Sequence, residues 1–233
     1  MSVTEILKNH SPIAISTETE KKLSVVASRL QTENKKYNLT ALTEDEDVAL
    51  LHFADCLQLL KFVDFKKKSV IDIGCGGGFP ALVIAAAEES MRLTALDSTA
   101  KKLTFVEETA ELAGINNLQV LCGRAEEKAI ELRESFDIAV SRGVTRLNAL
   151  CELCLPYVKV GGVFVAMKGA AGDVEAAEAE KAIKMLGGTL TEIIPAPVPG
   201  RGDGHCLVVI RKTAKTPVKY PRAWAKIKSA PIS

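Results

Sequence analysis

The sequence predicts an α/β protein in which a mostly parallel sheet is covered by helices on both faces. From Ser69 onward, short apolar runs alternate with stretches of helical periodicity, which is the pattern of parallel strands joined by helical crossovers. A glycine-rich turn, residues 74–78, directly follows the first apolar run, and ligands bind at such turns in open α/β sheets. Residues 1–65 have helical periodicity only, so we expect a helical extension before the sheet.

Two helix starts are predicted within residues 1–65. Thr17 with Glu20, and Thr43 with Glu46, have the spacing of capping boxes, so we expect one helix to begin at each threonine. The polar and aromatic segment 37–40 separates these two helices.

Seven strands are predicted between residues 66 and 212, the segment that we expect to form the catalytic domain. They are the apolar runs Val70–Ile73, Leu93–Leu96, Leu118–Leu121, Phe136–Ser141, Val163–Met167, Leu190–Ile194 and Cys206–Ile210. Helices are expected at residues 80–89, 101–112, 146–157 and 173–186. Residues 213–233 contain three prolines and no periodicity, so we expect them to form an extended basic tail.

The charge of the chain is distributed unevenly. Its 233 residues have a formal net charge of only +1. From Gly204 onward, however, there are seven Lys and Arg residues and no Asp or Glu, while the rest of the chain has 23 basic and 29 acidic residues. An acidic body with one basic end is expected of a protein that presents that end to phosphate groups.

Several classes of protein are disfavoured by the sequence. No apolar run is long enough to span a membrane, and residues 1–16 do not have the pattern of a signal peptide. We therefore expect a cytoplasmic protein whose six cysteines are reduced thiols. Cys151 and Cys154 lie in an apolar helical stretch, and the three histidines are scattered, so we expect no metal site.

The glycine-rich turn is the strongest indication of a ligand site. Glycines 74, 76 and 78 let the backbone turn sharply and approach a ligand closely. The turn also fits a dinucleotide-binding pattern, but Asp72 at the strand end would repel a pyrophosphate and suits the ammonium and sulfonium of S-adenosylmethionine (AdoMet). Phe79, where the turn meets the next helix, can cover part of this cofactor.

Further candidates follow the ends of other predicted strands. Asp97 lies 19 residues after Gly78, where an acid accepts the ribose hydroxyls of a nucleotide or caps the following helix. In this architecture Ala125 and Glu126 lie beside the adenine, although a solvated loop explains them equally well.

Two basic residues end strands in the same way. Arg142 and Lys168 follow the fourth and fifth strands, where ligands bind in such sheets; a surface side chain paired with an acid is the alternative interpretation.

These motifs together resemble the GidB family of rRNA guanine-N7 methyltransferases, in the same order and at the same spacing. The matching segments are Asn38-Leu39-Thr40, His52 with Asp55, Asp72–Pro80, Leu96-Asp97-Ser98 with Lys101-Lys102, Arg124–Glu127, Ser141-Arg142, Met167-Lys168-Gly169, Leu207–Ile210 and Tyr220-Pro221-Arg222. The resemblance implies a Rossmann-like, seven-stranded class I methyltransferase fold with an N-terminal helical extension.

The resemblance also implies the ligand contacts. Gly74, Phe79, Ala125, Glu126 and Arg142 would contact AdoMet, with Asp97 at its ribose. This chain departs from the family at two positions, where Gly143 replaces the usual Ala and His205 replaces an Arg found in many members. We expect Arg201 to take over the phosphate contact of the replaced Arg.

The expected reaction needs no general base, because guanine N7 has a free lone pair. Arg124, Arg142 and Lys168 would instead position the RNA or the guanine carbonyl, as basic side chains commonly do. Expected RNA-binding residues are Lys168, Arg201, His205, Arg211, Lys212 and Arg222. The expected partner of this monomeric enzyme is small-subunit (16S) ribosomal RNA or the 30S particle, with no membrane and no metal. Tyr220 and Trp224 would stack on RNA or pack on their own domain.

Three alternatives remain open from the sequence. The first is an AdoMet-dependent enzyme that acts on another RNA, a protein or a small molecule. The second is a NAD-dependent oxidoreductase that uses the same glycine turn. The third is an RNA-binding module without catalytic activity, against which the intact turn and Asp97 argue.

Overall fold

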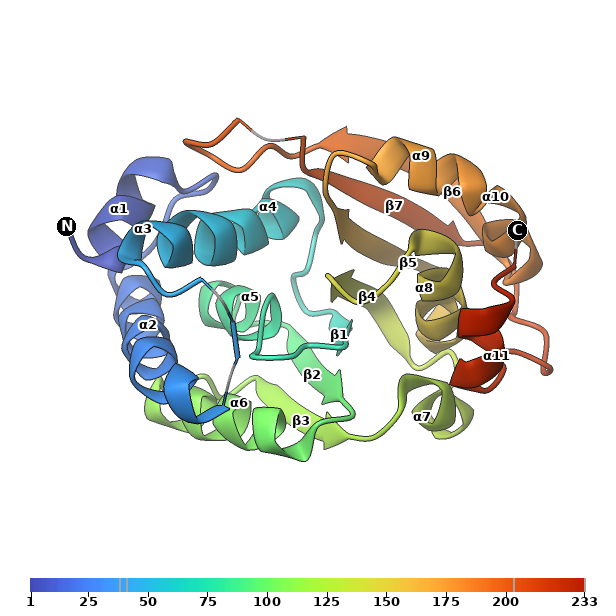
Figure 1. Cartoon of the computed structure of the whole chain (residues 1–233), viewed down its shortest axis with the longest axis horizontal. Coiled ribbons are helices and arrows are strands. Elements are labelled where there is room, and N and C mark those ends of the chain that lie inside the picture. The colour runs from blue at the N-terminus through green and yellow to red at the C-terminus, as the bar shows by residue number, and fades with distance from the viewer. Residues whose placement is uncertain (38, 41, 203, 233) are drawn as a thin grey trace.

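A seven-stranded sheet forms the centre of the molecule in a computed structural model that describes residues 1–37, 39, 40, 42–202 and 204–232 (Figure 1). The strands are β1 (Ser69–Ile73), β2 (Arg92–Asp97), β3 (Leu118–Cys122), β4 (Phe136–Arg142), β5 (Val158–Lys168), β6 (Gly188–Pro195) and β7 (Cys206–Lys212). Their order is β3-β2-β1-β4-β5-β7-β6, with β7 antiparallel to both of its neighbours. All seven predicted strands are confirmed. Their bounds differ from the prediction by at most two residues, except that β5 begins five residues earlier.

The order of the strands fixes where a ligand can bind. The chain moves outward from β1 to β3 and then returns to β4 on the other side of β1. Neighbouring crossovers therefore diverge beside β1 and leave a crevice at the carboxyl ends of the strands, which is where open α/β sheets bind ligands.

Helices cover both faces of this sheet. Those before β4 are α1 (Val3–His10), α2 (Thr17–Tyr37), α3 (Asp45–Asp47), a π-helix (Val48–Ala54), α4 (Asp55–Phe62), α5 (Ala81–Ala87), α6 (Ala100–Leu112) and α7 (Ala125–Glu131). Those after β4 are α8 (Leu147–Cys154), a 3₁₀ turn (Leu155–Tyr157), α9 (Gly172–Glu178), α10 (Glu180–Met185) and α11 (Trp224–Ser229). None of the helices in the described part of the chain is both long and apolar enough to cross a membrane.

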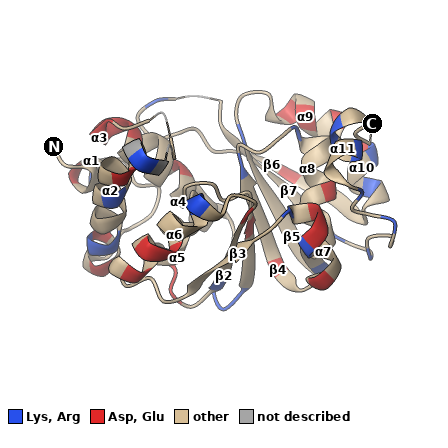
Figure 2. Ribbon diagram, turned by 60° about the horizontal axis from the view of Figure 1, so that its bottom comes forward, with Lys and Arg blue, Asp and Glu red and all other residues tan. Residues whose placement is uncertain are grey.

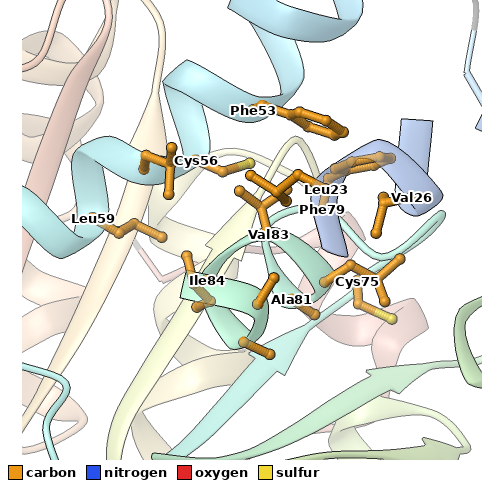
Figure 3. Packing of buried hydrophobic residues seen from close by; sticks show 14 of the residues in the cluster. Leu23, Val26, Phe53, Cys56, Leu59, Cys75, Phe79, Ala81, Val83 and Ile84 are labelled. Carbon is orange, nitrogen blue, oxygen red and sulfur yellow. The ribbon is translucent and has the colours of Figure 1, made fainter. Parts of the chain in front are cut away.

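Alternate strand residues separate two apolar clusters. On β1, Val70 belongs to the cluster shared with α1, α2, α4, α5 and α6, whereas Ile71 and Ile73 belong to the cluster shared with α8, α9, α10 and α11. Figure 3 shows the first cluster, where residues of the π-helix and α4, such as Phe53 and Leu59, surround α5 together with residues of α2. The N-terminal helices and the sheet therefore bury one common core.

Both predicted capping boxes are wrong. Helix α2 does begin at Thr17, but Ser16 caps it, because the Ser16 Oγ accepts a hydrogen bond from the backbone N–H of Thr19 at 3.0 Å. Helix α3 begins at Asp45, and no side chain caps it. The N-cap of this helix is Glu44, so Thr43 does not form the predicted capping box. The first helix therefore starts at the predicted residue with a different cap, and the second starts two residues after Thr43.

The helices around the fourth and sixth strands also differ from expectation. Residues 125–131 form helix α7, so Ala125 and Glu126, for which a solvated loop was the alternative interpretation, lie in its first turn. The single helix expected at 173–186 is two helices, α9 and α10, which meet at Ala179.

The extended tail predicted for residues 213–233 is also wrong. Residues 224–229 form α11, and Ile227 and Ile232 are buried in the second apolar cluster. Tyr220 is 6 % exposed, so the aromatic side chain packs on its own domain. Figure 2 shows charges of both signs around α11 rather than a separate basic arm. Isolated apolar residues between prolines carry this packing, and they produce no helical periodicity in the sequence.

Candidate active site

A cavity of about 480 Å³ lies at the carboxyl ends of β1, β2, β3 and β4, at the crevice that the strand order predicts. This volume is typical of small-molecule sites. The lining residues come from four regions of the chain: the segment before the sheet (Leu39, Thr40, His52), the glycine turn (Ile73–Gly77, Phe79), the ends of β2, β3 and β4 (Leu96, Asp97, Ser98, Lys102, Gly123–Glu126, Arg142–Val144), and the second helical layer (Leu153, Trp224). Asn38 lies outside the described residues.

The glycines of the turn have different tasks. Gly74 and Gly76 line the cavity and have φ angles of +75° and +55°, which disfavour any residue with a side chain. Gly78 does not line the cavity. A Cβ atom there would lie 2.5 Å from Leu82 Cδ1, so Gly78 allows α5 to pack closely against the turn.

Asp72 does not line the cavity either, contrary to the expected contact with the cofactor ammonium. Its carboxyl is fully buried under the turn, where Oδ2 accepts a hydrogen bond from the backbone N–H of Ala81 at 3.2 Å. Burial raises the pKa of Asp72 to about 7. Asp72 therefore ties β1 to the first residue of α5 and shapes the turn from below.

Asp97 reaches the cavity at the end of β2. Its Oδ2 accepts the N–H of Gly76 at 3.0 Å, and its Oδ1 accepts the N–H of Thr99 at 2.8 Å. Each carboxylate oxygen has two acceptor positions, so one on each remains for a ligand hydroxyl. The two backbone bonds hold the carboxylate in place. The alternative role of Asp97 as a helix cap is wrong, because Thr99 is the N-cap of α6 and no side chain caps that helix.

The segment 124–126 forms the far wall of the cavity. Arg124 Nε lies 3.3 Å from Glu126 Oε1, and the hydroxyl of Tyr157 donates to the carbonyl of Ala125 at 2.6 Å. The guanidinium carbon of Arg124 lies 5.9 Å from the centre of the Trp224 ring. Trp224, expected to stack on RNA or pack on the domain, thus borders the same cavity as the glycine turn.

Arg142 is held by the π-helix at the opposite end of the cavity. Its Nη1 donates to the carbonyl of Leu51 at 2.8 Å and to Asp55 Oδ2 at 3.0 Å, and its Nη2 lies 3.0 Å from His52 Nδ1. The guanidinium carbon also lies 5.8 Å from the ring centre of Phe79, on which the His52 ring stacks at 4.5 Å. Arg142 thus lines the cavity, and its acidic partner Asp55 is buried and does not lie at the surface.

The protonation of His52 follows from these contacts. Burial and the Arg142 guanidinium lower the pKa of His52 to about 4, so the imidazole is neutral near pH 7. Because Arg142 donates to Nδ1, the proton lies on Nε2 and is donated to the hydroxyl oxygen of Thr40 at 3.0 Å. Thr40 also accepts the N–H of Leu42 at 3.0 Å, which leaves its own hydroxyl proton available to the cavity.

A second cavity, of about 320 Å³, shares Arg142 and Gly143 with the first. Lys168 lines it and is 10 % exposed, with its Nζ 2.7 Å from the carbonyl of Thr145 and 2.8 Å from Glu175. His205 lines it too, with Nδ1 at 3.1 Å from Asp55 Oδ1. The structure therefore brings three predicted site residues, Arg142, Lys168 and His205, around one space.

Other predicted RNA-binding residues lie elsewhere. Lys212 is fully buried and donates to the carbonyl of Leu155 at 2.6 Å, so the expected contact with RNA is wrong. Arg211 is exposed but pairs with Val163 in the middle of β5, five residues along the strand from Lys168.

Arg222 and Arg201 each form an ion pair within the protein. Arg222 donates through Nε and Nη2 to both carboxylate oxygens of the buried Glu152, at 2.8 and 2.6 Å. Arg201 pairs with Asp47 beside the π-helix and lines neither of the two cavities.

Sequence reasoning missed the part that His52 and Thr40 play in the cavity. His52 and Asp55 entered the sequence analysis only as a segment that matches the family, whereas the structure joins them through Arg142. The signal was present in the sequence as two polar residues three apart in an otherwise apolar helix. Among the described residues, no three His, Cys, Asp or Glu side chains are grouped so that they could hold a metal ion.

Solved structures of other proteins share the fold of this chain. The crystal structure of M. jannaschii TYW2 in complex with AdoMet matches with a TM-score of 0.53 and 16% identity, over 66% of this chain and 74% of that chain. The ribosomal protein L11 methylase from Lactobacillus delbrueckii subsp. bulgaricus matches with a TM-score of 0.53 and 16% identity, over 69% of this chain and 78% of that chain. These likenesses confirm the Rossmann-like methyltransferase fold.

Sequence comparisons identify the family. The family model GidB, described as rRNA small subunit methyltransferase G, matches residues 19–196. Ribosomal RNA small subunit methyltransferase G of Clostridium tetani is 45% identical over 208 residues, covering 88% of this chain and 87% of its relative. The protein of the same name from Clostridium botulinum (strain Alaska E43 / Type E3) is 40% identical over 223 residues, covering 94% and 93%. This chain therefore belongs to the GidB family of small-subunit ribosomal RNA methyltransferases.

Proposed function

We propose that this chain transfers a methyl group from AdoMet to N7 of a guanine in small-subunit ribosomal RNA, with the cofactor in the first cavity and the guanine in the second. The observation that carries the proposal is that the two cavities meet at Arg142 and Gly143. A donor and an acceptor in adjoining cavities can be aligned for direct transfer, and alignment of this kind is worth about 7–11 kcal/mol.

The residues of the first cavity fit AdoMet. Asp97 keeps one acceptor position on each oxygen for the two ribose hydroxyls. No side chain blocks the cavity at Gly76, because nothing lies within 4 Å of the position that a Cβ atom would occupy. Glu126 at the far wall is 11 % exposed and offers an acceptor to the amino group of adenine. AdoMet, when bound, supplies a methyl group that is already activated by its sulfonium.

The residues of the second cavity fit a purine base. Met167, Ala196 and Leu207 supply apolar surface, and Lys168 supplies an ammonium that can donate to the guanine O6. Holding O6 leaves the neighbouring N7 free to accept the methyl group. Because the target base must leave its stack to enter a cavity, the guanine lies in an exposed loop or is flipped out.

No general base is needed, and the charged groups between the cavities are already engaged. The Nδ1 lone pair of His52 accepts from Arg142, and Asp55 is shared by Arg142 and His205. These residues position the guanidinium at the junction and remove no proton. The proposal predicts that a substitution at His52 weakens binding and alignment but does not abolish chemistry outright.

Methylation of RNA from a strain that lacks the modification tests the proposal. The purified full chain would be incubated with methyl-labelled AdoMet and either naked 16S RNA or 30S particles, and labelled nucleosides would be identified after digestion. We expect label in 7-methylguanosine, and in one of the two substrates more than in the other. The variant Lys168→Met, which changes the second cavity, should lose activity. The matched control Lys228→Ala, at an exposed position outside both cavities, should retain it.

The same experiment separates the alternatives. Label in another nucleoside, or in a protein or small molecule, would contradict the proposed acceptor and leave the methyltransferase activity standing. Stabilisation of the chain by NADH but not by S-adenosylhomocysteine would contradict the proposed cofactor. Since its proposed substrate is ribosomal RNA, we place the enzyme in the cytoplasm, acting as a monomer.

A further inference from the structure

We infer that Trp224 forms the adenine-binding wall of the cofactor cavity, so that the C-terminal segment binds the nucleoside of AdoMet. This inference rests on the proposed function, because it requires the first cavity to hold the cofactor. Trp224 is the only tryptophan of the chain and lies 127 residues after Asp97, yet it lines the same cavity as the glycine turn.

Trp224 lies between the protein core and the first cavity. Helix α11 begins at Trp224 and lies beside α7 and α8 at one end of the molecule (Figure 1). The side chain is half-buried, packs against the second apolar cluster and lines the first cavity. It is therefore fixed to the protein on one side and open to the ligand space on the other.

The segment that carries Trp224 is anchored on both sides of it. Before it, Arg222 makes a two-pronged ion pair with the buried Glu152 of α8, and Arg133 donates to the carbonyls of Thr216 and Tyr220. After it, Ile227 is fully buried. A residue held between two anchors of this kind is positioned before the ligand arrives, which lowers the entropy lost on binding.

The neighbours of Trp224 indicate which part of the cofactor it meets. Arg124, Ala125 and Glu126, at the end of β3, line the same cavity, as does the apolar Leu153 of α8, and Arg124 lies against the Trp224 ring. Asp97, the proposed ribose ligand, ends β2, which lies between β3 and β1. Moving outward from the glycine turn of β1, the ribose therefore comes first and the base second.

The chemistry of this wall suits a flat heteroaromatic ring with an amino group. Trp224 and Leu153 offer apolar surface for the ring faces, and Glu126 offers an acceptor for the amino edge. Stacking of a base on an aromatic side chain typically changes affinity severalfold to about a hundredfold. The Arg124 guanidinium, 5.9 Å from the indole, holds the ring against the cavity by a cation–π contact.

Intrinsic fluorescence provides a direct test, because Trp224 is the only tryptophan in the chain. S-adenosylhomocysteine and 5′-methylthioadenosine would be titrated into the full chain, with methionine as the ligand that lacks a base. We expect both nucleosides to change the tryptophan emission in a saturable manner and methionine to leave it unchanged. Calorimetric titration of the same samples gives the dissociation constants independently of the fluorescence.

Three variants complete the test. Trp224→Ala should weaken S-adenosylhomocysteine binding about tenfold, Trp224→Phe should keep it within about threefold, and Lys228→Ala, at an exposed position on the same helix, should not change it. Thermal unfolding of each variant identifies any loss of affinity that is due to misfolding, and Trp224→Phe retains the packing. The affinity of the same variants for a 16S RNA fragment would be measured in parallel.

Each outcome decides the inference. If the wild type and Trp224→Ala bind S-adenosylhomocysteine equally well, and the tryptophan emission of the wild type does not respond to it, the inference is overturned while the proposed cofactor stands. If Trp224→Ala instead loses affinity only for RNA, the residue is an RNA-stacking platform and the inference is equally wrong. If the wild-type chain binds no S-adenosylhomocysteine in the calorimeter, the proposed function fails first and the inference with it.

Discussion

Replacing Arg222 by Ala should destabilise the protein instead of acting on RNA binding alone. The sequence assigns Arg222 to a basic tail that contacts phosphate, whereas its guanidinium pairs with Glu152, whose side chain is fully buried on α8. The backbone N–H of Arg222 adds a third hydrogen bond to the same carboxylate at 2.8 Å. The Ala variant keeps the third bond and loses the other two.

The expected loss of stability follows from the Glu152 carboxylate, which stays buried in the Arg222→Ala variant. Breaking a buried ion pair by removing one partner typically costs about 3–5 kcal/mol, mainly because the other charge stays buried without compensation. Arg222 is 24 % exposed, so water can partly replace it, and we expect the lower end, about 3 kcal/mol. For a chain of this length that corresponds to a decrease in Tm of about 6–12 °C.

Scanning calorimetry and urea unfolding of Arg222→Ala, with Lys228→Ala as an exposed control in the same segment, would measure this loss. The double variant Arg222→Met/Glu152→Leu should be more stable than Arg222→Ala, because it leaves no buried charge. The reasoning is refuted if Arg222→Ala unfolds within about 0.5 kcal/mol of the wild type, the scatter expected of ordinary surface substitutions.

Three further predictions follow from the site and its surroundings. His52 has a pKa of about 4 in the folded chain against 6.5 when exposed, so neutral His52 contributes stability that is present above pH 6.5 and is lost as the pH falls to 4. In urea unfolding, His52→Gln should remove about 3 kcal/mol of this change in unfolding free energy with pH. If the wild type and the variant lose stability in parallel as the pH falls, His52 is not its source. Gly78→Ala should cost about 2–4 kcal/mol, because the new Cβ atom overlaps Leu82, whereas Gly114→Ala, with the same kind of φ angle but open space, should cost about 1 kcal/mol in the same assay. Lys212→Met should leave the salt dependence of RNA binding unchanged, since the ammonium is buried; a flatter slope in filter binding would show that Lys212 does reach phosphate.

The fold and half of the site follow from local patterns in the sequence. The strands were predictable because buried parallel strands are continuous apolar runs, and the turn at Gly74 and Gly76 because few residues other than glycine adopt its backbone angles. Asp97 was predictable from its place at a strand end. These signals involve residues close together in the sequence, so no tertiary contact is needed to interpret them.

The remainder depends on contacts between distant residues. The charge of Lys212 or Arg222 suggests a surface role until the structure shows a carbonyl or a buried carboxylate opposite each of them. Trp224 belongs to the cavity only because α11 packs on α8, and Asp72 is excluded from it only because α5 lies above its carboxyl. A single sequence contains no signal for such pairings.

The carboxylate of Asp55 couples the substitutions that positions 142 and 205 can accept. One oxygen holds Arg142 and the other lies 3.1 Å from His205, the position at which the resemblance to the family led us to expect an Arg. Exchanging His205 for Arg would place two permanent cations on one carboxylate, and the fitness of that exchange would depend on what stands at 142. Substitutions at these positions should therefore be epistatic, and a lineage that changes one of them alters which residues the other can tolerate.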